Sequence, residues 1–236
     1  MYNKKKCESV RLFKVSAIIP AAGSGSRFGE RKQFKLLNGQ PLWCYTLAPF
    51  VRSKLINEIV FVVHEEFIST VLASENFKSL SKNKDIKVVA GGSNRTESVL
   101  NGILSTNKTN DLICIHDAAR PFIKDSLITK TVNACKEFDG SILAIPSNDT
   151  IKIVQGGVIE KTIDRRIVRM AQTPQTFHKN KLLDAYKNNV DSNVTDECTI
   201  MELSGYSIKI IDGDNENFKI TNSLDWEMAK IKVGRK

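Results

Sequence analysis

The chain reads Ala17-Ile-Ile-Pro-Ala-Ala-Gly-Ser-Gly-Ser-Arg27 near its start, an apolar run that leads directly into a glycine-rich loop. The β-forming and small apolar residues over 15–19 predict a buried strand. Pro20 ends that strand, because proline has no N–H to donate to a sheet. A buried strand that opens into such a loop is typical of an α/β fold, in which the loop lies at the edge of the sheet.

The loop itself has the composition of a site for nucleotide phosphates. Gly23 and Gly25 permit backbone conformations that other residues resist, so several N–H groups can face one anion. Arg27 and Lys32 supply the positive charge that a bound triphosphate requires. The alternative is an ordinary strand-to-helix turn with solvated charges.

The spacing of this loop excludes two familiar phosphate-binding loops. It has no Gly-Lys-Ser/Thr, as a Walker-type loop requires, and it lacks the third glycine of the dinucleotide fingerprint. A nicotinamide-dependent dehydrogenase is therefore disfavoured, and no carboxylate follows about 20 residues later at a second strand end.

Apolar runs of strand length recur along the chain, several of them separated by segments of helical periodicity. This alternation predicts an α/β fold with a mostly parallel sheet buried on both faces. Helices are expected over 41–50 and 95–104. Ligands of such sheets bind at the carboxyl ends of strands, so the loops after Ile19, Val89 and Ile115 are the candidate site. The predicted strands cover 15–19, 58–63, 86–89, 112–115, 141–145 and 207–211.

One segment breaks the alternation. Two β-rich runs, 150–154 and 158–162, flank Gln155-Gly-Gly157, which is a turn signal. We therefore expect a hairpin arm over about 149–165. Its alternating charges indicate one packed and one solvated face, so the arm is expected to pack on something outside the core.

Length and composition limit the alternatives. The 236 residues suffice for one large domain over 15–236, with a flexible tail over 1–14. The tail has no apolar h-region and the chain no run of 18 apolar residues, so neither a secretory signal nor a membrane span is expected. Five cysteines without a CxxC pair indicate neither a disulfide framework nor a zinc site, which fits the cytoplasm.

The net charge of +9 suits a phosphorylated ligand or nucleic acid. The lysines are scattered singly and do not form one stripe interleaved with aromatic residues, so nucleic acid is not the expected partner. An RNA-binding module would show a salt-dependent affinity that free nucleotide does not compete away.

A second chemical signal is Ile113-Cys-Ile-His-Asp-Ala-Ala-Arg-Pro121, where an apolar strand ends in charged residues. Asp117 could help to hold Mg²⁺ or position a hydroxyl, and Arg120 could bind a phosphate or the same substrate. The alternative is a structural ion pair between the two. His116 is expected to be a hydrogen-bonded structural imidazole, because no ligand spacing links the three histidines.

Three further segments complete the pattern. The glycine turn over 90–98 follows a strand and leads into a helix, so its backbone could approach a flat base. The segment 171–176 carries small hydroxyls in an extended context before and after a proline. Lys219 lies among β-forming residues after an acidic run, where it either pairs with those acids or faces the cleft.

Together these motifs resemble the 2-C-methyl-D-erythritol 4-phosphate cytidylyltransferase family of the non-mevalonate isoprenoid pathway, in order and spacing, from Val15 to about Lys230. The matching motifs are Pro20-Ala-Ala-Gly-Ser-Gly-Ser-Arg-Phe28, Lys32-Gln-Phe34, Gly91-Gly92, His116-Asp-Ala-Ala-Arg-Pro121, Asp149-Thr-Ile-Lys152, Thr162-Ile-Asp-Arg165, Gln172-Thr-Pro-Gln175, Thr195-Asp-Glu197 and Asn217-Phe-Lys-Ile-Thr221.

The resemblance implies a Rossmann-like nucleotidyltransferase that joins CTP to a sugar-alcohol phosphate and releases pyrophosphate. It assigns catalysis to Arg27, Lys32 and Lys219. It places the CTP pocket at Pro20, Ala21, Ala22, Gly23, Gly25, Gly92, Ser93 and Ser98. It gives the alcohol phosphate to Asp117, Arg120, Thr173 and Thr195, with Thr150 and Arg165.

The same resemblance implies a homodimer whose arms cross, so that Thr150 and Arg165 reach the substrate of the other subunit. Mg²⁺, or another divalent cation, would be held mainly by the phosphates, with Asp117 as a possible ligand. A phosphate monoester, with a second pKa of about 6, is already ionised near neutral pH and needs no catalytic base. Catalysis would then depend on positioning and on cations that match the charge at phosphorus.

Two positions depart from the commonest family pattern. Ser26 lies where a basic residue is frequent, and Arg31 lies where proline is usual, which leaves the path of the loop to Lys32 open. The nearest rival is a ribitol 5-phosphate cytidylyltransferase. Pro20-Ala-Ala-Gly23 and Asp117-Ala-Ala-Arg120 favour the methylerythritol enzymes, because the ribitol enzymes tend to have Leu-Ala-Gly-Gly and Asp-Ala-Val-Arg there.

Overall fold

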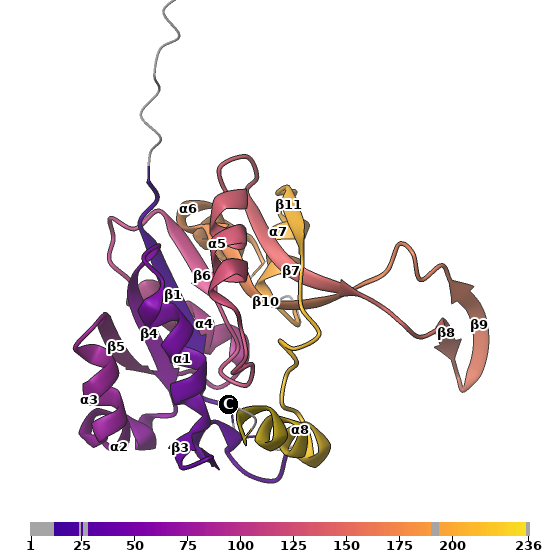
Figure 1. Cartoon of the computed structure of the whole chain (residues 1–236). Helices are drawn as coiled ribbons and strands as arrows, with labels where there is room; N and C mark the ends of the chain where they lie inside the picture. The colour runs from indigo at the N-terminus through magenta and orange to yellow at the C-terminus, as the bar shows by residue number, and fades with distance from the viewer. Residues whose placement is uncertain (1–11, 24, 26–27, 190–193, 235–236) are drawn as a thin grey trace, which may run out of the picture.

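The computed structural model describes residues 12–23, 25, 28–189 and 194–234. Within this part of the chain the central sheet consists of β1 (Val15–Pro20), β4 (Ile56–Val63), β5 (Asp85–Ala90), β6 (Leu112–Ile115), β7 (Gly140–Pro146), β10 (Arg169–His178) and β11 (Ile208–Asp212). Their spatial order is β11-β7-β10-β6-β1-β4-β5 (Figure 1). All neighbouring pairs are parallel except those of β10, which is antiparallel to β6 and β7. The mostly parallel sheet is confirmed, and the six predicted strands each coincide with one of these.

Strand β10 is absent from the predicted set, although it lies between β6 and β7 in the middle of the sheet. Its sequence contains no apolar run, and Pro174 interrupts it. The pairing with β7 shifts register between Gln172 and Gln175, which accommodates the proline that has no N–H to donate. The extended conformation expected there is confirmed, but the sequence pattern did not predict a sheet strand.

Helices cover both faces of the sheet. They are α1 (Leu42–Arg52), α2 (Ile68–Ala73), α3 (Glu75–Ser81), α4 (Arg95–Leu104), α5 (Asp125–Ala134), α6 (Lys179–Asn188), α7 (Glu197–Leu203) and α8 (Ser223–Gly234). Short elements complete the described chain: 3-10 helices η1 (Lys32–Phe34) and η2 (Glu65–Phe67), and the strand pair β2 (Leu36–Leu37) and β3 (Gln40–Pro41). The two predicted helices correspond to α1 and α4. None of the described helices is long and apolar enough to cross a membrane.

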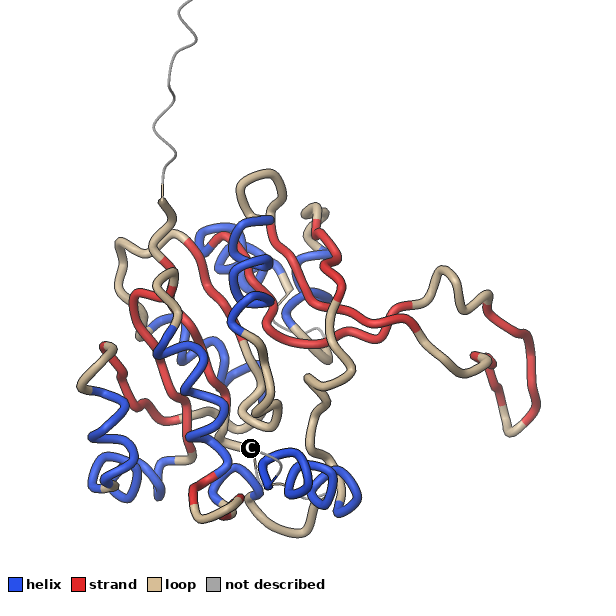
Figure 2. The backbone as a smooth tube through the Cα atoms, viewed as in Figure 1, coloured by secondary structure: helices blue, strands red, loops and turns tan. Residues whose placement is uncertain are grey.

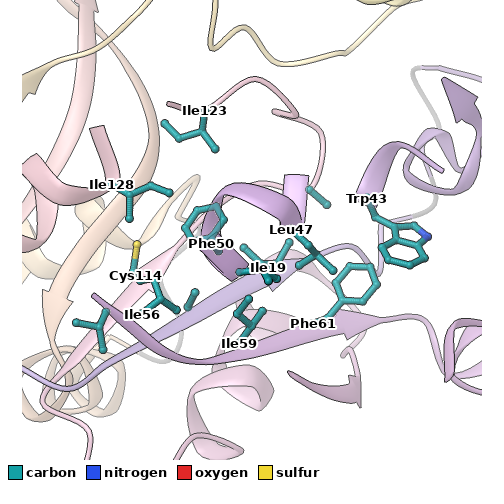
Figure 3. Packing of buried hydrophobic residues seen from close by; sticks show 14 of the residues in the cluster. Ile19, Trp43, Leu47, Phe50, Ile56, Ile59, Phe61, Cys114, Ile123 and Ile128 are labelled. Carbon is teal, nitrogen blue, oxygen red and sulfur yellow. The ribbon is translucent and has the colours of Figure 1, made fainter. Parts of the chain in front are cut away.

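Alternate side chains of β1 enter two separate hydrophobic layers, as a strand's period of two requires. Val15, Ala17 and Ile19 pack with residues of α1 and α5 on one face, whereas Ile18 packs with α4, α6 and α7 on the other. Figure 3 shows the first layer, in which Phe50 and Leu47 of α1 lie over Ile19. These layers fix the carboxyl end of β1, and with it the glycine-rich loop.

A buried carboxylate ties the opposite end of the sheet together. Glu58 of β4 accepts hydrogen bonds from the Ser16 hydroxyl (2.6 Å), the Asn110 amide (2.8 Å) and the backbone N–H of Asn107 (2.7 Å). Its other oxygen accepts from Lys87 at 2.9 Å. Burial raises the pKa of Glu58, but these donors together hold it below its ordinary value.

The predicted hairpin is present as strands β8 (Ile151–Gln155) and β9 (Val158–Ile163). It projects away from the rest of the molecule, as Figures 1 and 2 show. Val154, Val158 and Ile159 are 54%, 71% and 59% exposed, so in the chain alone these three apolar side chains remain largely in solvent.

Candidate active site

A cavity of about 560 Å³ lies at the carboxyl ends of β1, β5 and β6. The three loops that the sequence singled out supply most of its walls, and residues 31–33, His64 and Lys219 supply the rest. Among the predicted site residues, those that line it are Pro20, Ala21, Ala22, Gly23, Gly25, Lys32, Gly92, Ser93, Ser98, Asp117 and Lys219. Lining residues that the sequence analysis did not assign include Arg31, Gln33, Asn94 and Arg95.

The buried side chain of Gln33 is hydrogen-bonded to the backbone of the first loop. Its amide donates to the carbonyl oxygens of Ala21 (2.6 Å) and Gly23 (2.9 Å). Gly25 has φ +73°, in the left-handed region that favours glycine, and a side chain there would overlap the carbonyl of Glu30. These contacts hold the described part of the loop, at Ala21, Gly23 and Gly25.

Lys32 lies in η1 and faces the same cavity, with its ammonium nitrogen 5.7 Å from the centre of the Phe28 ring. Arg31, which replaces the usual proline, pairs with Glu66 at 2.9 Å, and its guanidinium lies 4.9 Å from the centre of the Phe67 ring. These contacts attach η1 to η2 and define the path of the chain to Lys32. Arg27 lies outside the described residues.

The second loop approaches the first closely. A side chain on Gly91 would overlap the methyl group of Ala22 and lie 2.8 Å from the Ser98 hydroxyl oxygen, so only glycine fits there. The Ser98 hydroxyl accepts the backbone N–H of Gly92 at 3.0 Å and thereby fixes the turn that also carries Ser93. The two loops form one continuous wall of backbone and small side chains, which suits the flat face of a base.

Asp117 is the centre of a group of charges, the Asp117 cluster, which consists of Asp117, Lys219, Arg95 and Arg120. Lys219 lies 2.8 Å from the carboxylate, Arg95 3.5 Å and Arg120 3.8 Å. Burial raises the pKa of Asp117, but the three cations together hold it well below its ordinary value. Asp117 is therefore ionised and positions three basic groups beside the cavity.

Arg95 is the functional candidate that the sequence analysis missed. Its guanidinium makes a two-pronged pair with the buried Glu197 of α7, at 2.8 and 3.0 Å, and Glu197 also accepts from the Tyr186 hydroxyl at 3.3 Å. Both charged residues belong to segments already singled out, yet 102 positions separate them and no spacing rule connects them. The pair anchors Arg95 so that it faces Asp117.

Two other predicted residues lie directly behind Asp117. Thr173 accepts the Asp117 N–H at 3.0 Å and is only 4% exposed. Arg120 donates to the Asn217 carbonyl at 2.8 Å, while its buried Nε has no hydrogen-bond partner within the described residues. Arg120 is not among the residues that line the cavity, so this buried N–H lies behind the cavity wall.

The remaining predicted residues are not part of the cavity wall. Thr150 and Arg165 lie at the base of the arm and are exposed, and Arg165 donates to the Asn148 carbonyl at 2.8 Å. Thr195 is exposed in the loop before α7. A single chain therefore does not bring the arm residues to the cavity.

The donor set fits a metal held chiefly by its ligand's phosphates. Asp117 is the only acidic residue that lines the cavity among the residues described, and it is already paired with three cations. The described chain contains no group of three or more His, Cys, Asp or Glu side chains that could hold a metal. Mg²⁺ often binds proteins in this way, through one carboxylate and substrate phosphates.

Comparisons with known proteins agree with this geometry. Residues 15–235 match the family model for 2-C-methyl-D-erythritol 4-phosphate cytidylyltransferase. The relative of that name from Clostridium acetobutylicum is 39% identical over 219 residues, covering 91% of this chain and 95% of the relative. The relative from Petrotoga mobilis is 38% identical, covering 92% and 96%.

Solved structures lead to the same assignment. The 4-diphosphocytidyl-2C-methyl-D-erythritol synthase of Anaerococcus prevotii superposes with a TM-score of 0.83 at 29% identity, covering 95% of this chain and 100% of that one. The Francisella tularensis cytidylyltransferase gives 0.78 at 29% identity, with 93% and 99% covered. By sequence and by fold, this chain belongs to the 2-C-methyl-D-erythritol 4-phosphate cytidylyltransferase family.

Proposed function

We propose that the chain performs the cytidylyl transfer of its family in the cavity at the ends of β1, β5 and β6. The reaction joins CTP to 2-C-methyl-D-erythritol 4-phosphate, giving 4-diphosphocytidyl-2-C-methyl-D-erythritol and pyrophosphate. The observation that carries the proposal is the juxtaposition of Lys32, Arg95 and Lys219 around one cavity whose only acidic lining residue among those described is Asp117. Such a basic site suits two phosphorylated substrates.

The nucleotide is assigned to the two glycine loops. The two loops approach each other closely at Gly91 and form one surface against which cytosine would pack. This surface consists of backbone at Ala21, Ala22, Gly92 and Ser93, with Ser98 behind it. The loop held by Gln33 then offers its N–H groups to the phosphates. Arg27 and Lys32 follow in sequence and supply the charges for the triphosphate.

The chemistry requires no catalytic base from the protein. An oxygen of the alcohol phosphate, already ionised near neutral pH, attacks the α-phosphorus of CTP, and the bond to the pyrophosphate oxygen breaks. Lys32 and Lys219 stabilise the charge that develops on the phosphoryl oxygens. Lys219 is held for this role by Asp117, at 2.8 Å.

A divalent cation, Mg²⁺ in the simplest case, would be held by the phosphates of CTP with Asp117 as its nearest carboxylate. When bound, it neutralises phosphate charge. The Asp117 cluster keeps that carboxylate ionised, so it remains able to bind a cation or to accept a hydrogen bond from a hydroxyl group.

We also propose a homodimer formed through the arm. An isolated two-stranded hairpin is marginally stable in water, and this one exposes Val154, Val158 and Ile159. A second copy of the chain would cover these side chains and receive Thr150 and Arg165 beside its own cavity. Residues 15–236 would then act as one catalytic domain, after a tail over 1–14, in the cytoplasm.

Mixing two inactive variants tests the shared site. Lys219→Ala removes a cavity residue, and Arg165→Ala removes an arm residue. If the arm serves the partner's cavity, a mixed dimer contains one intact site. Random mixing makes about half of the dimers mixed, so about a quarter of the wild-type activity returns. No recovery, with mixed dimers demonstrated by mass, would place the arm and cavity of the same chain together or remove Arg165 from the site.

A further inference from the structure

A chain of buried hydrogen bonds runs behind the Asp117 cluster and passes through His116. The imidazole is fully buried, with Nε2 2.9 Å from the carbonyl oxygen of Arg120 and Nδ1 3.0 Å from the Thr173 hydroxyl. The Thr173 oxygen in turn accepts the backbone N–H of Asp117 at 3.0 Å. These hydrogen bonds therefore connect His116 to Arg120, Thr173 and Asp117, all of which are assigned to the alcohol phosphate.

The partners fix which nitrogen carries the proton. The carbonyl oxygen of Arg120 can only accept, so Nε2 must donate to it. The ring is fully buried and its nitrogens bond to a carbonyl and a hydroxyl, with no carboxylate against either one among the described residues. It is therefore neutral, and with the proton on Nε2, Nδ1 has none. The hydroxyl of Thr173 must then donate to Nδ1.

With this assignment the Thr173 hydroxyl donates its only proton to Nδ1 of His116. One of its lone pairs already accepts the Asp117 N–H, so a single acceptor position remains. Thr173 cannot donate to a phosphate oxygen while His116 stays neutral. It can accept a hydrogen bond from a hydroxyl group.

We propose that His116 is a positioning residue that fixes Thr173 as a hydrogen-bond acceptor, so that this part of the site binds a hydroxyl of the alcohol phosphate and not its phosphate. The inference rests on the proposed function, because it concerns the second substrate of that reaction. His116 directly follows the last residue of β6. Its bond to the Arg120 carbonyl also closes the turn over 117–120, in which the Arg120 N–H donates to the Asp117 carbonyl at 3.0 Å. Phe50 packs against the ring, 5.1 Å between centres.

Kinetics with two single variants and their combination test the proposal. Thr173→Val removes the hydroxyl, and His116→Phe keeps a flat ring but removes both ring nitrogens, and with them the acceptor of the Thr173 proton. Each is expected to raise KM for the alcohol phosphate by about tenfold, the scale of one hydrogen bond, while KM for CTP changes by less than about twofold. Because both act on one oxygen, the double variant should be no worse than the worse single variant. Thr173→Ser should restore KM.

Thr176→Val is the matched control. Thr176 is a fully buried threonine on the same strand, and its hydroxyl donates to the Thr131 hydroxyl at 3.1 Å, away from the Asp117 cluster. It should lower the melting temperature as Thr173→Val does, but leave both KM values unchanged. Equal rises in KM for both substrates, additive effects in the double variant, or the same change in Thr176→Val would overturn the proposal.

A spectroscopic measurement separates this inference from the proposed function. Nitrogen-15 NMR of histidine-labelled protein identifies which ring nitrogen is protonated, without any turnover. We expect the His116 signals of a neutral ring with a proton on Nε2 throughout pH 6–8, shifted by Thr173→Val. A proton on Nδ1 would refute the assignment even in an active enzyme. An inactive protein with the expected signals would refute the reaction and leave the hydrogen-bond chain standing.

Discussion

Replacing Lys219 tests the electrostatic account of catalysis most sharply. Its ammonium group lies 2.8 Å from Asp117 and faces the cavity, so it is positioned before the substrates bind. One unit charge at about 4 Å contributes about 4 kcal/mol at an effective dielectric constant near 20. Loss of one preorganised donor lowers kcat by about 10²–10³-fold in other enzymes, a consistent magnitude. We therefore expect Lys219→Ala to lower kcat by at least about a hundredfold.

The assay is pyrophosphate release at saturating CTP and alcohol phosphate, so that kcat is measured apart from binding. Asp117 keeps Arg95 and Arg120 as partners, so the variant should fold and melt close to wild type. Lys230→Ala, which removes an exposed lysine paired with Glu227, controls for the loss of general positive charge and should leave kcat unchanged. A folded Lys219→Ala enzyme with kcat within threefold of wild type would exclude Lys219 from transition-state stabilisation.

Three other perturbations follow from the structure. Glu58→Gln should destabilise the protein by about 2 kcal/mol at pH 7.5, the scale of hydrogen bonds to a charged group, in urea unfolding. Because folding lowers the pKa of Glu58, this difference in the free energy of unfolding is present above the unfolded-state pKa and should shrink as the pH falls below about 4.5. A difference that stays constant with pH would contradict the prediction. Gly91→Ala should raise KM for CTP by about tenfold or more, because the added methyl group separates the two loops, whereas Gly234→Ala, in open space, should leave KM unchanged. Unchanged CTP kinetics in Gly91→Ala would show that the close approach of the loops plays no part in nucleotide binding. Val158→Asp should weaken dimerisation by at least about tenfold, measured by light scattering, because burial of a valine contributes about 1.5–3 kcal/mol; a dimer of unchanged stability would place the interface elsewhere.

Much of the fold was predictable because burial leaves a clear pattern in the sequence. Strand β6 has four consecutive buried residues, and β1 alternates its side chains between two cores. Strand β10 was missed because most of its buried residues, Phe177 apart, are polar and form tertiary hydrogen bonds: Gln172 bonds to the chain at Asp214, and Gln175 to Asp196 and Cys198. Composition alone cannot distinguish such a strand from a loop.

The site was predictable to a similar extent. The three loops were found because glycine spacing and abrupt strand ends are local signals. The pair of Arg95 with Glu197 and the proton of Thr173 were not, because each depends on residues that only the folded sheet brings together. His116 was expected to be a structural imidazole, and the geometry places it between two residues assigned to the substrate.

The most direct test of the central claim is pyrophosphate release by the purified protein from CTP and Mg²⁺, measured in parallel with 2-C-methyl-D-erythritol 4-phosphate and ribitol 5-phosphate. We expect release with the methylerythritol substrate and only background release with ribitol 5-phosphate. Release with ribitol 5-phosphate alone, or with neither substrate, would contradict that claim.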